Sequence, residues 1–496
     1  MLLSALSSCG SLDNMNLNPD TPTTVTPDFL ATEIILQNTT SDASKWLFGD
    51  SWIVKSTSST EHMEWWLYNK FERGSFSNYT ILTDSKKMVE LAEANASYSD
   101  ATKNAYRGLD HFIQAYVYYG LTMQMGDIPC SEAVKGESDA IFSPAYDSQE
   151  KVFGTILNDL QSAYNEFGSA STFGGDPIFS GDPAMWQRTV NSFELRVLMM
   201  LSKKNTVDGK SVQSLFEEVA ARPLLTDDEN SFARTFSATV SSQWYPYYYE
   251  KQNFWAYPVM TSFFVNMMKN LNDYRLFYYA EPATAITDKA ANTFDAYNGV
   301  DPNIEYGLVQ QGATEGKYSA ENKRYYRLPQ GDPRKFICYS ETQFVLAEAA
   351  LKGWKTPLSA KEHYENGVRA AMKFTANHTP EEYRHGVTID DAYIDSYLKG
   401  AAAFKASEGL KQIMIQKYIG SFVQLPFNSY YDYRRTGLPE IPIDPTTNMN
   451  EVKTQLPIRW MYPQEEYSQN KTNIASAIQS QFGGSDTPND VMWLLK

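Results

Sequence analysis

The sequence predicts a mostly α-helical globular protein. Apolar residues recur with the 3.6-residue period of a helix over most of the chain, and explicit helix start signals precede several of these stretches. Hydrophobic residues make up 42% of the 496 residues and aromatic residues 14%. Disordered chains are depleted in both types, so the chain has the means to form a large packed core.

The first nine residues resemble the end of a bacterial secretory segment that closes on a lipobox. An apolar run leads to Leu6-Ser7-Ser8-Cys9, where small residues would fit a signal peptidase. We therefore expect Cys9 to carry a lipid; the alternative is a free thiol behind a chance apolar start. No basic residues precede the run, so we expect the precursor to begin further upstream. Residues 1–20 would be signal remnant, anchor and tether, and residues 21–496 a single body.

Start signals and periodicity locate individual helices. A capping side chain precedes a proline at Thr26-Pro27, Asp182-Pro183 and Thr379-Pro380. Ser359 and Glu362 have the spacing of a capping box. Periodicity predicts helices over about 102–125, 341–354 and 364–374, of which the last two should form an antiparallel pair. Such pairs are similar to tetratricopeptide hairpins, although the consensus of that repeat is not clean here.

The segment 232–333 is rich in Tyr, Trp, Gly and Asn and breaks the helical pattern, apart from a predicted helix over 261–271. Loops on a rigid scaffold often carry function. Two dense aromatic clusters, one over residues 65–68 and one over residues 244–257, could stack against a ligand that presents an apolar face and many hydroxyl groups. The candidate ligand-binding residues are Trp65, Trp66, Tyr68, Tyr245, Tyr247, Tyr249 and Trp255. Alternatively, these rings fill the core. In an extended run, Tyr247 and Tyr249 would face one side and Tyr248 the other.

No residue set in the sequence specifies a reaction. Nucleophile-elbow and dinucleotide-binding motifs are absent, and three cysteines and five histidines show no zinc-ligand spacing. We therefore expect neither a cofactor nor a metal, and no enzymatic activity. The net charge of −16 argues against nucleic acid as a partner.

Six segments in the same order along the chain resemble those of the SusD/RagB family of nutrient-binding outer-membrane lipoproteins. They are Asn16-Leu17-Asn18-Pro19-Asp20 after Cys9; the helix from Ala105 that ends at Gly126-Asp127-Ile128-Pro129; Asn272-Asp273-Tyr274-Arg275-Leu276; the helix Glu341 to Ala350; Gln416-Lys417-Tyr418 with Tyr431-Asp432-Tyr433-Arg434-Arg435-Thr436-Gly437; and Ile458-Arg459-Trp460-Met461-Tyr462-Pro463. Tyr274 stands where the family usually has proline. The resemblance implies a mostly α-helical SusD-like fold, with tetratricopeptide-like hairpins and a loop-rich, irregular ligand-binding region.

The resemblance also implies a function. The protein would bind oligosaccharides at the cell surface as an outer-membrane lipoprotein, without catalysis, and deliver them to a TonB-dependent, SusC-like β-barrel transporter. The same role with oligopeptides is an alternative, as are a helical-scaffold glycan-degrading enzyme and an adaptor that binds only protein. The block 432–437 and the helix 344–350 are implied to be scaffold. No ligand position transfers, because these residues vary within the family.

Overall fold

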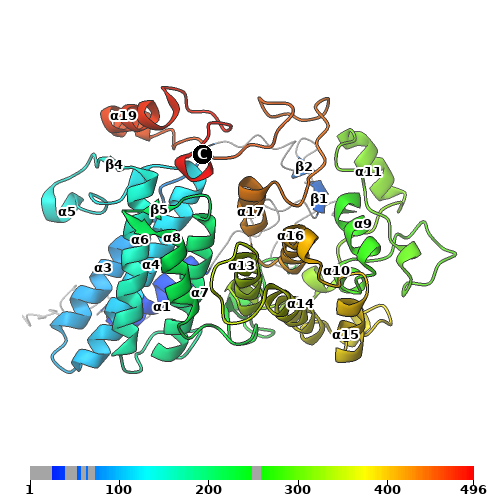
Figure 1. Cartoon of the computed structure of the whole chain (residues 1–496), viewed down its shortest axis with the longest axis horizontal. Helices are drawn as coiled ribbons and strands as arrows, with labels where there is room; N and C mark the ends of the chain where they lie inside the picture. The colour runs from blue at the N-terminus through cyan, green and yellow to red at the C-terminus, as the bar shows by residue number, and fades with distance from the viewer. Residues whose placement is uncertain (1–24, 40–52, 57–62, 65–72, 249–258, 426) are drawn as a thin grey trace, which may run out of the picture.

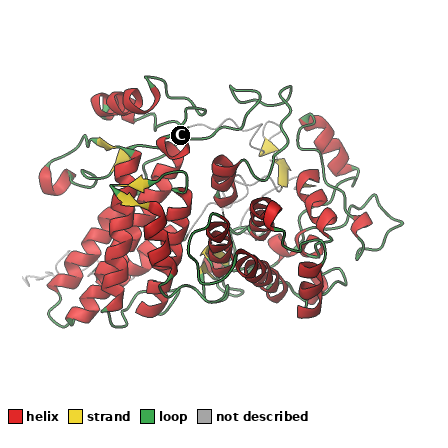
Figure 2. Cartoon of the chain, in the orientation of Figure 1, coloured by secondary structure: helices red, strands yellow, loops and turns green. Residues whose placement is uncertain are grey.

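A computed structural model describes residues 25–39, 53–56, 63–64, 73–248, 259–425 and 427–496. Helices dominate this part of the chain, and the strands are short (Figures 1 and 2). This confirms the predicted mostly α-helical fold. None of the described helices is long and apolar enough to cross a membrane.

The helices form two groups that meet near the middle of the molecule (Figure 1). Their bounds are α1 Pro27–Asn38, α3 Tyr79–Ala94, α4 Asp100–Met125, α5 Gly136–Asp139, α6 Gln149–Gly168, α7 Pro183–Met200, α8 Val212–Ala220, α9 Ser262–Leu271, α10 Arg275–Tyr279, α11 Tyr306–Thr314, α12 Arg324–Arg327, α13 Tyr339–Leu351, α14 Ala360–Asn377, α15 Asp391–Lys399, α16 Gly409–Gly420, α17 Asn428–Thr436, α18 Glu466–Gln469 and α19 Lys471–Phe482. Helices α1, α3, α4, α6, α7 and α8 form the group on the left of the figure.

The described strands form small, separate sheets, and the helices make up the body. Their bounds are β1 Ile53–Ser56, β2 Met63–Glu64, β3 Ile128–Pro129, β4 Tyr146–Asp147, β5 Thr206–Val207, β6 Lys210–Ser211, β7 Phe232–Arg234, β8 Val259–Met260 and β9 Arg334–Ile337. Among the described strands, β2, β1 and β8 form a three-stranded antiparallel sheet in that order, and the others pair two by two.

Side-chain caps fix the helix starts where the sequence predicts them. Thr26 accepts a hydrogen bond from the backbone N of Phe29 at the start of α1, and Asp182 accepts one from Ala184 at the start of α7. Ser359 and Glu362 form the predicted reciprocal capping box at α14. Each cap satisfies a backbone donor that would otherwise lack a partner.

The start signal at Thr379-Pro380 does not begin an α-helix. Only one 3₁₀ turn follows, over Glu381–Tyr383, and no side chain caps it. The hydroxyl of Thr379 instead donates to the carbonyl of Thr375, one turn back in α14, at 2.8 Å. This backward bond makes the capping side chain unavailable to the next segment.

Helices α13 and α14 form the predicted antiparallel pair. The ring of Phe344 in α13 lies against Gly367, where an added Cβ would come within 2.7 Å of it. Tyr339, at the start of α13, lines the same cavity as Phe374, near the end of α14. The two helices therefore run in opposite directions in close contact.

Helix α13 contributes to two separate hydrophobic cores. Val345, Leu346 and Ala349 pack into the core of the left-hand helices. Phe344 and Ala347 pack into a second core, with α9, α10 and α14 to α16. All residues from Ser340 to Ala349 are buried, the polar ones included, so α13 is a central element that both cores cover.

Candidate ligand-binding site

The β2–β1–β8 sheet joins the chain segments next to both predicted aromatic clusters. Trp65 follows β2 directly in the sequence, and the cluster that ends at Tyr257 comes shortly before β8. Lys55 of β1 pairs with Glu64 of β2, and Ile53 of β1 pairs with Met260 of β8. The described strands beside the two clusters, β2 and β8, therefore lie in one small sheet, although 195 positions separate Glu64 from Val259.

A groove of about 500 Å³ opens where the chain leaves this sheet and enters α9. Its described lining consists of Ser262, Phe263, Asn266, Met267, Asn270, Asp301, Asn303 and Pro442. The α9 residues recur every three to four positions, so they share one helix face. The other wall combines two segments without regular secondary structure.

Backbone contacts hold the segment that carries Asp301 and Asn303, one wall of the groove, against the start of α9. The N–H of Val300 donates to the carbonyl of Met260 at 2.9 Å, and the N–H of Ser262 donates to the carbonyl of Val300 at 2.7 Å. A Cβ on the preceding Gly299 would lie 2.4 Å from the backbone N of Ser262. Only glycine permits this close approach, so the position of the wall depends on it.

The described lining of the groove is rich in amides and carries a single ionisable group. Asn266 and Asn270 are exposed on α9, and the Oδ1 of Asn303 is buried without a hydrogen-bond partner in the described structure. Asp301 supplies the only charge among the lining residues that the structure describes. Asparagine both donates and accepts hydrogen bonds, and the half-buried ring of Phe263 offers an apolar surface beside it. This combination suits an uncharged ligand with many hydroxyl groups.

Tyr245 and Tyr247, two of the candidate ligand-binding residues, lie in the second hydrophobic core. Each is 1% exposed. Their ring centroids are 5.7 Å apart, and Phe236 packs edge-on against Tyr245. Burial raises the pKa of Tyr245 well above its ordinary value. The geometry therefore matches the core alternative for these two rings.

The prediction of an extended run through Tyr247 and Tyr248 is wrong. The N–H of Tyr248 donates to the carbonyl of Tyr245 at 3.0 Å, which closes a turn around Pro246. Because of this turn, Tyr247 and Tyr248 do not alternate between a solvent face and a core face, and both are buried. Trp244 is the half-buried ring of the described run, and its indole N–H has no hydrogen-bond partner in the described structure.

The remaining candidates lie outside the residues that the structure describes, and their roles stay predictions. They are Cys9, Trp65, Trp66, Tyr68, Tyr249 and Trp255. Within the described ranges, no group of three or more His, Cys, Asp or Glu side chains is placed to hold a metal ion.

Comparison with known proteins identifies the family. Residues 19–463 match the model of the SusD-like family, described as starch-binding and associating with the outer membrane. The chain belongs to the SusD-like family. No curated protein sequence matches it.

Solved structures of similar proteins agree with the SusD-like fold. A SusD homologue from Bacteroides fragilis NCTC 9343 is 36% identical, with a TM-score of 0.88 over 95% of this chain and 100% of its own. A protein from Bacteroides vulgatus ATCC 8482, described provisionally as an outer-membrane protein involved in nutrient binding, is 30% identical, with a TM-score of 0.84 over the same shares. A further SusD homologue from Bacteroides fragilis NCTC 9343 is 30% identical, with a TM-score of 0.81, again over 95% and 100% of the two chains.

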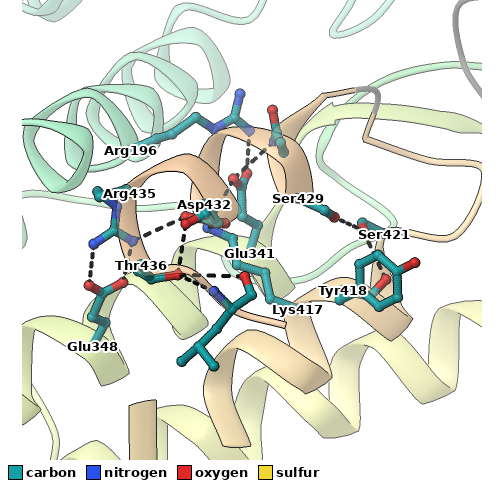
Figure 3. A network of polar contacts seen from close by, with 12 residues as sticks. Arg196, Glu341, Glu348, Lys417, Tyr418, Ser421, Ser429, Asp432, Arg435 and Thr436 are labelled. Atoms are coloured by element: carbon teal, nitrogen blue, oxygen red, sulfur yellow. Dashed lines mark hydrogen bonds and ion pairs between the residues drawn. The ribbon is translucent and has the colours of Figure 1, made fainter. Parts of the chain in front are cut away.

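The SusD-like segment 432–437 is scaffold, as the resemblance implies. Arg435 on α17 forms two contacts with the carboxylate of Glu348 on α13, and its Nη2 also lies 3.1 Å from Asp432 (Figure 3). Lys417 on α16 approaches the other oxygen of Asp432 at 2.7 Å. Burial alone would favour the neutral carboxyl, but Lys417 and Arg435 outweigh it and hold the pKa of Asp432 below its ordinary range. These buried charges join α13, α16 and α17 and do not line the groove.

A second SusD-like segment closes a buried ring of polar contacts. The guanidinium of Arg275 binds the carboxylate of Asp273 at 2.5 Å and the side-chain oxygen of Gln416 at 2.6 Å. Gln416 donates to the hydroxyl of Tyr397 at 2.6 Å, which donates to Asp273 at 2.8 Å. The ring ties α10, α15 and α16 together, so these residues are also scaffold.

Sequence reasoning missed the groove residues Phe263, Asn266, Asn270 and Asn303. The helix over 261–271 was predicted, and its exposed face carries Phe263, Asn266 and Asn270 at helical spacing. That pattern was a usable signal. Asn303 and Pro442 reach the groove only through the tertiary fold, so sequence spacing could not place them.

Proposed function

We propose that the protein is a non-catalytic outer-membrane lipoprotein that captures oligosaccharides at the bacterial surface. The match of residues 19–463 to a family described as starch-binding and associating with the outer membrane carries this proposal. The Bacteroides vulgatus relative, assigned provisionally to the outer membrane and to nutrient binding, supports the same role.

The groove beside α9 supports a neutral glycan as the ligand. Its volume of about 500 Å³ suits a few sugar units, since small-molecule sites commonly measure about 300–1,000 Å³. The amides of Asn266 and Asn270 can hydrogen-bond sugar hydroxyls, and the ring of Phe263 can contact the apolar face of a sugar. An oligopeptide could hydrogen-bond the same amides, so the experiment below also includes peptides.

Isothermal titration with maltoheptaose, a panel of other neutral oligosaccharides and a casein-derived peptide mixture tests the proposal. We expect oligosaccharide binding without hydrolysis. Phe263→Ala, Asn266→Ala and Asn270→Ala should each weaken it about two- to tenfold, because each removes one exposed or half-buried contact. The melting temperature should stay that of the wild type.

Gln37→Ala serves as the matched control, since it removes an exposed side-chain amide from α1 in the left-hand group. It should leave binding unchanged. Wild-type affinity in all three groove variants would contradict the groove assignment. Binding of peptides but not oligosaccharides would replace the glycan with the peptide alternative, and product formation would indicate an enzyme.

We further propose that the bound glycan passes to a TonB-dependent, SusC-like β-barrel transporter through the helix-hairpin faces of the body. Affinity purification of the tagged protein from outer membranes in mild detergent should recover a large β-barrel protein. Recovery of the tagged protein without a barrel protein would count against this partner.

A further inference from the structure

A second cavity, of about 600 Å³, lies between α7, α8 and the start of α13. Its described lining consists of Arg188, Glu217, Ala220, Ala221, Arg222, Leu224, Leu225, Thr226, Tyr339, Lys355, Thr356 and Pro357. It shares no described lining residue with the groove. Helix α8 belongs to the left-hand group in Figure 1, whereas α9 lies on the right.

Two cations in this cavity lack an ion-pair partner in the described structure. Arg188 donates from Nη1 to the carbonyl of Leu224 at 2.7 Å, which orients its guanidinium and leaves the other N–H groups open. Lys355 is exposed, and its ammonium group forms no ion pair with a described residue. Arg222, by contrast, is already paired with Glu194 and Glu218.

The described lining contains one carboxylate, that of Glu217, and this group already accepts two hydrogen bonds. It accepts the backbone N–H of Lys355 at 3.0 Å and the side-chain amide of Gln213 at 2.8 Å. These bonds, and to a smaller extent the charge of the Lys355 ammonium, lower the pKa of Glu217, so it stays ionised. Two cations, Arg188 and Lys355, therefore face one carboxylate, Glu217, and the described lining carries an excess of positive charge. The protein as a whole has a net charge of −16.

An apolar surface lies next to the free cations. Leu224, Ala220 and Pro357 contribute aliphatic atoms to the lining. The half-buried ring of Tyr339 separates this cavity from a smaller one of about 260 Å³, which it also lines together with Thr226. The hydroxyl of Tyr339 has no hydrogen-bond partner in the described structure, so it can donate to a ligand.

We propose that this cavity is a second binding site, for a small ligand that carries a carboxylate or sulfate group beside an apolar face. Arg188 and Lys355 would bind the anionic group, since an oriented guanidinium suits carboxylate and sulfate oxygens. Tyr339 and the aliphatic lining would contact the rest of the ligand. The site is chemically unlike the groove, whose described lining holds amides and no cation.

Titration with digalacturonate, its dimethyl ester and a sulfated heparin disaccharide tests the proposal. We expect at least one acidic probe to bind, more weakly at high salt. Arg188→Gln and Lys355→Gln should each reduce this binding about tenfold, since each removes a charged contact. If digalacturonate binds, its uncharged ester should bind at least tenfold more weakly. The acidic probe that binds identifies the anionic group.

Lys373→Gln is the matched control, because Lys373 lines the adjoining cavity but is ion-paired with Asp391 at 2.8 Å. It should bind the acidic probes like the wild type. Lys355 is exposed, so Lys355→Gln keeps the test valid if Arg188→Gln does not fold. The proposal is overturned if neither acidic probe binds at about 1 mM, if Lys355→Gln binds them like the wild type, or if ester and acid bind equally. Maltoheptaose binding reports on the groove separately.

Discussion

Two aspartates at the β3–β4 pair have pKa values that shift in opposite directions. Asp127 precedes β3 and is buried, and burial raises its pKa to about 7. Asp147 in β4 is also buried, yet its contacts with Lys151 at 2.5 Å and with the N–H of Ser131 at 2.6 Å outweigh burial and lower its pKa. The local partners, more than the burial itself, decide the direction of each shift.

The stability of an Asp127→Asn variant should therefore depend on pH differently from that of the wild type. In the wild type, the folded state holds a proton on Asp127 that the unfolded state releases above about pH 4. Raising the pH from about 4 to 7 thus favours unfolding, by up to about 1.4 kcal/mol per pH unit. The variant lacks this loss, so urea denaturation should show it gaining stability relative to the wild type over that range.

Asp147→Asn provides the opposite case. The lowered pKa of Asp147 stabilises the folded state above about pH 4, and this contribution disappears as the pH falls through the folded-state pKa. The variant should be less stable than the wild type near neutral pH, and the difference should shrink in acid. Parallel pH profiles for the two variants would refute at least one of the two assignments.

At the residue scale, the sequence was a better guide to scaffold than to ligand contacts. The buried role of Asp432 and Arg435 followed from the family resemblance, and the structure confirms it. Aromatic density did not distinguish a binding ring from a core ring, as Tyr245 and Tyr247 demonstrate. Both roles favour large flat side chains, and only the tertiary fold decides which rings solvent can reach.

Helix caps allow a direct test at the scale of one element. Ser359→Ala should reduce the free energy of unfolding by about 1 kcal/mol, because Glu362 N would lose the side-chain oxygen that it contacts at 3.3 Å. Chemical denaturation measures this difference. Asn78 occupies the same cap position at α3 but forms no side-chain cap bond, so Asn78→Ala should change stability by less than about 0.5 kcal/mol. Equal losses in both variants would contradict the assigned role of the capping box.

The long helices were predictable because local signals and burial agree. The helix predicted over 102–125 is α4, Asp100–Met125, with Ser99 as its cap and Gly126 as its end. The signal at Thr379 was misleading, since its hydroxyl has a competing acceptor one turn back. Short strands such as β1 and β8 depend on partners more than 200 residues away, which local sequence cannot reveal.

At the scale of the whole molecule, the lipid anchor is the prediction with the clearest cellular readout. Fatty-acid labelling of the full precursor should mark the wild type, and Cys9→Ala should be unlabelled and released from the outer-membrane fraction, because the thiol is the proposed acylation site. Cys338→Ala is a suitable control, since Cys338 is buried and free in the body. A wild type that takes up no label would refute the anchor.

The family could be recognised from the sequence because its scaffold segments occur in a fixed order. The match of residues 19–463 to the family model confirms the SusD-like family. The groove could not be located in the same way. Its walls come from α9, the chain around Asp301 and Pro442, and the Gly299 contact that aligns them is a tertiary one. The division into a tether of residues 1–20 and a single body stays a prediction.

Because α13 packs into both cores, the two cores cannot be separated at this helix. A recombination event or truncation that divides the chain at this helix would leave each fragment with an apolar face and no partner to cover it. Insertions are therefore best tolerated beside α11, whose Val309 packs in a third, small cluster and in neither of the cores that α13 joins. Insertions there would leave intact the one helix that holds the two cores together.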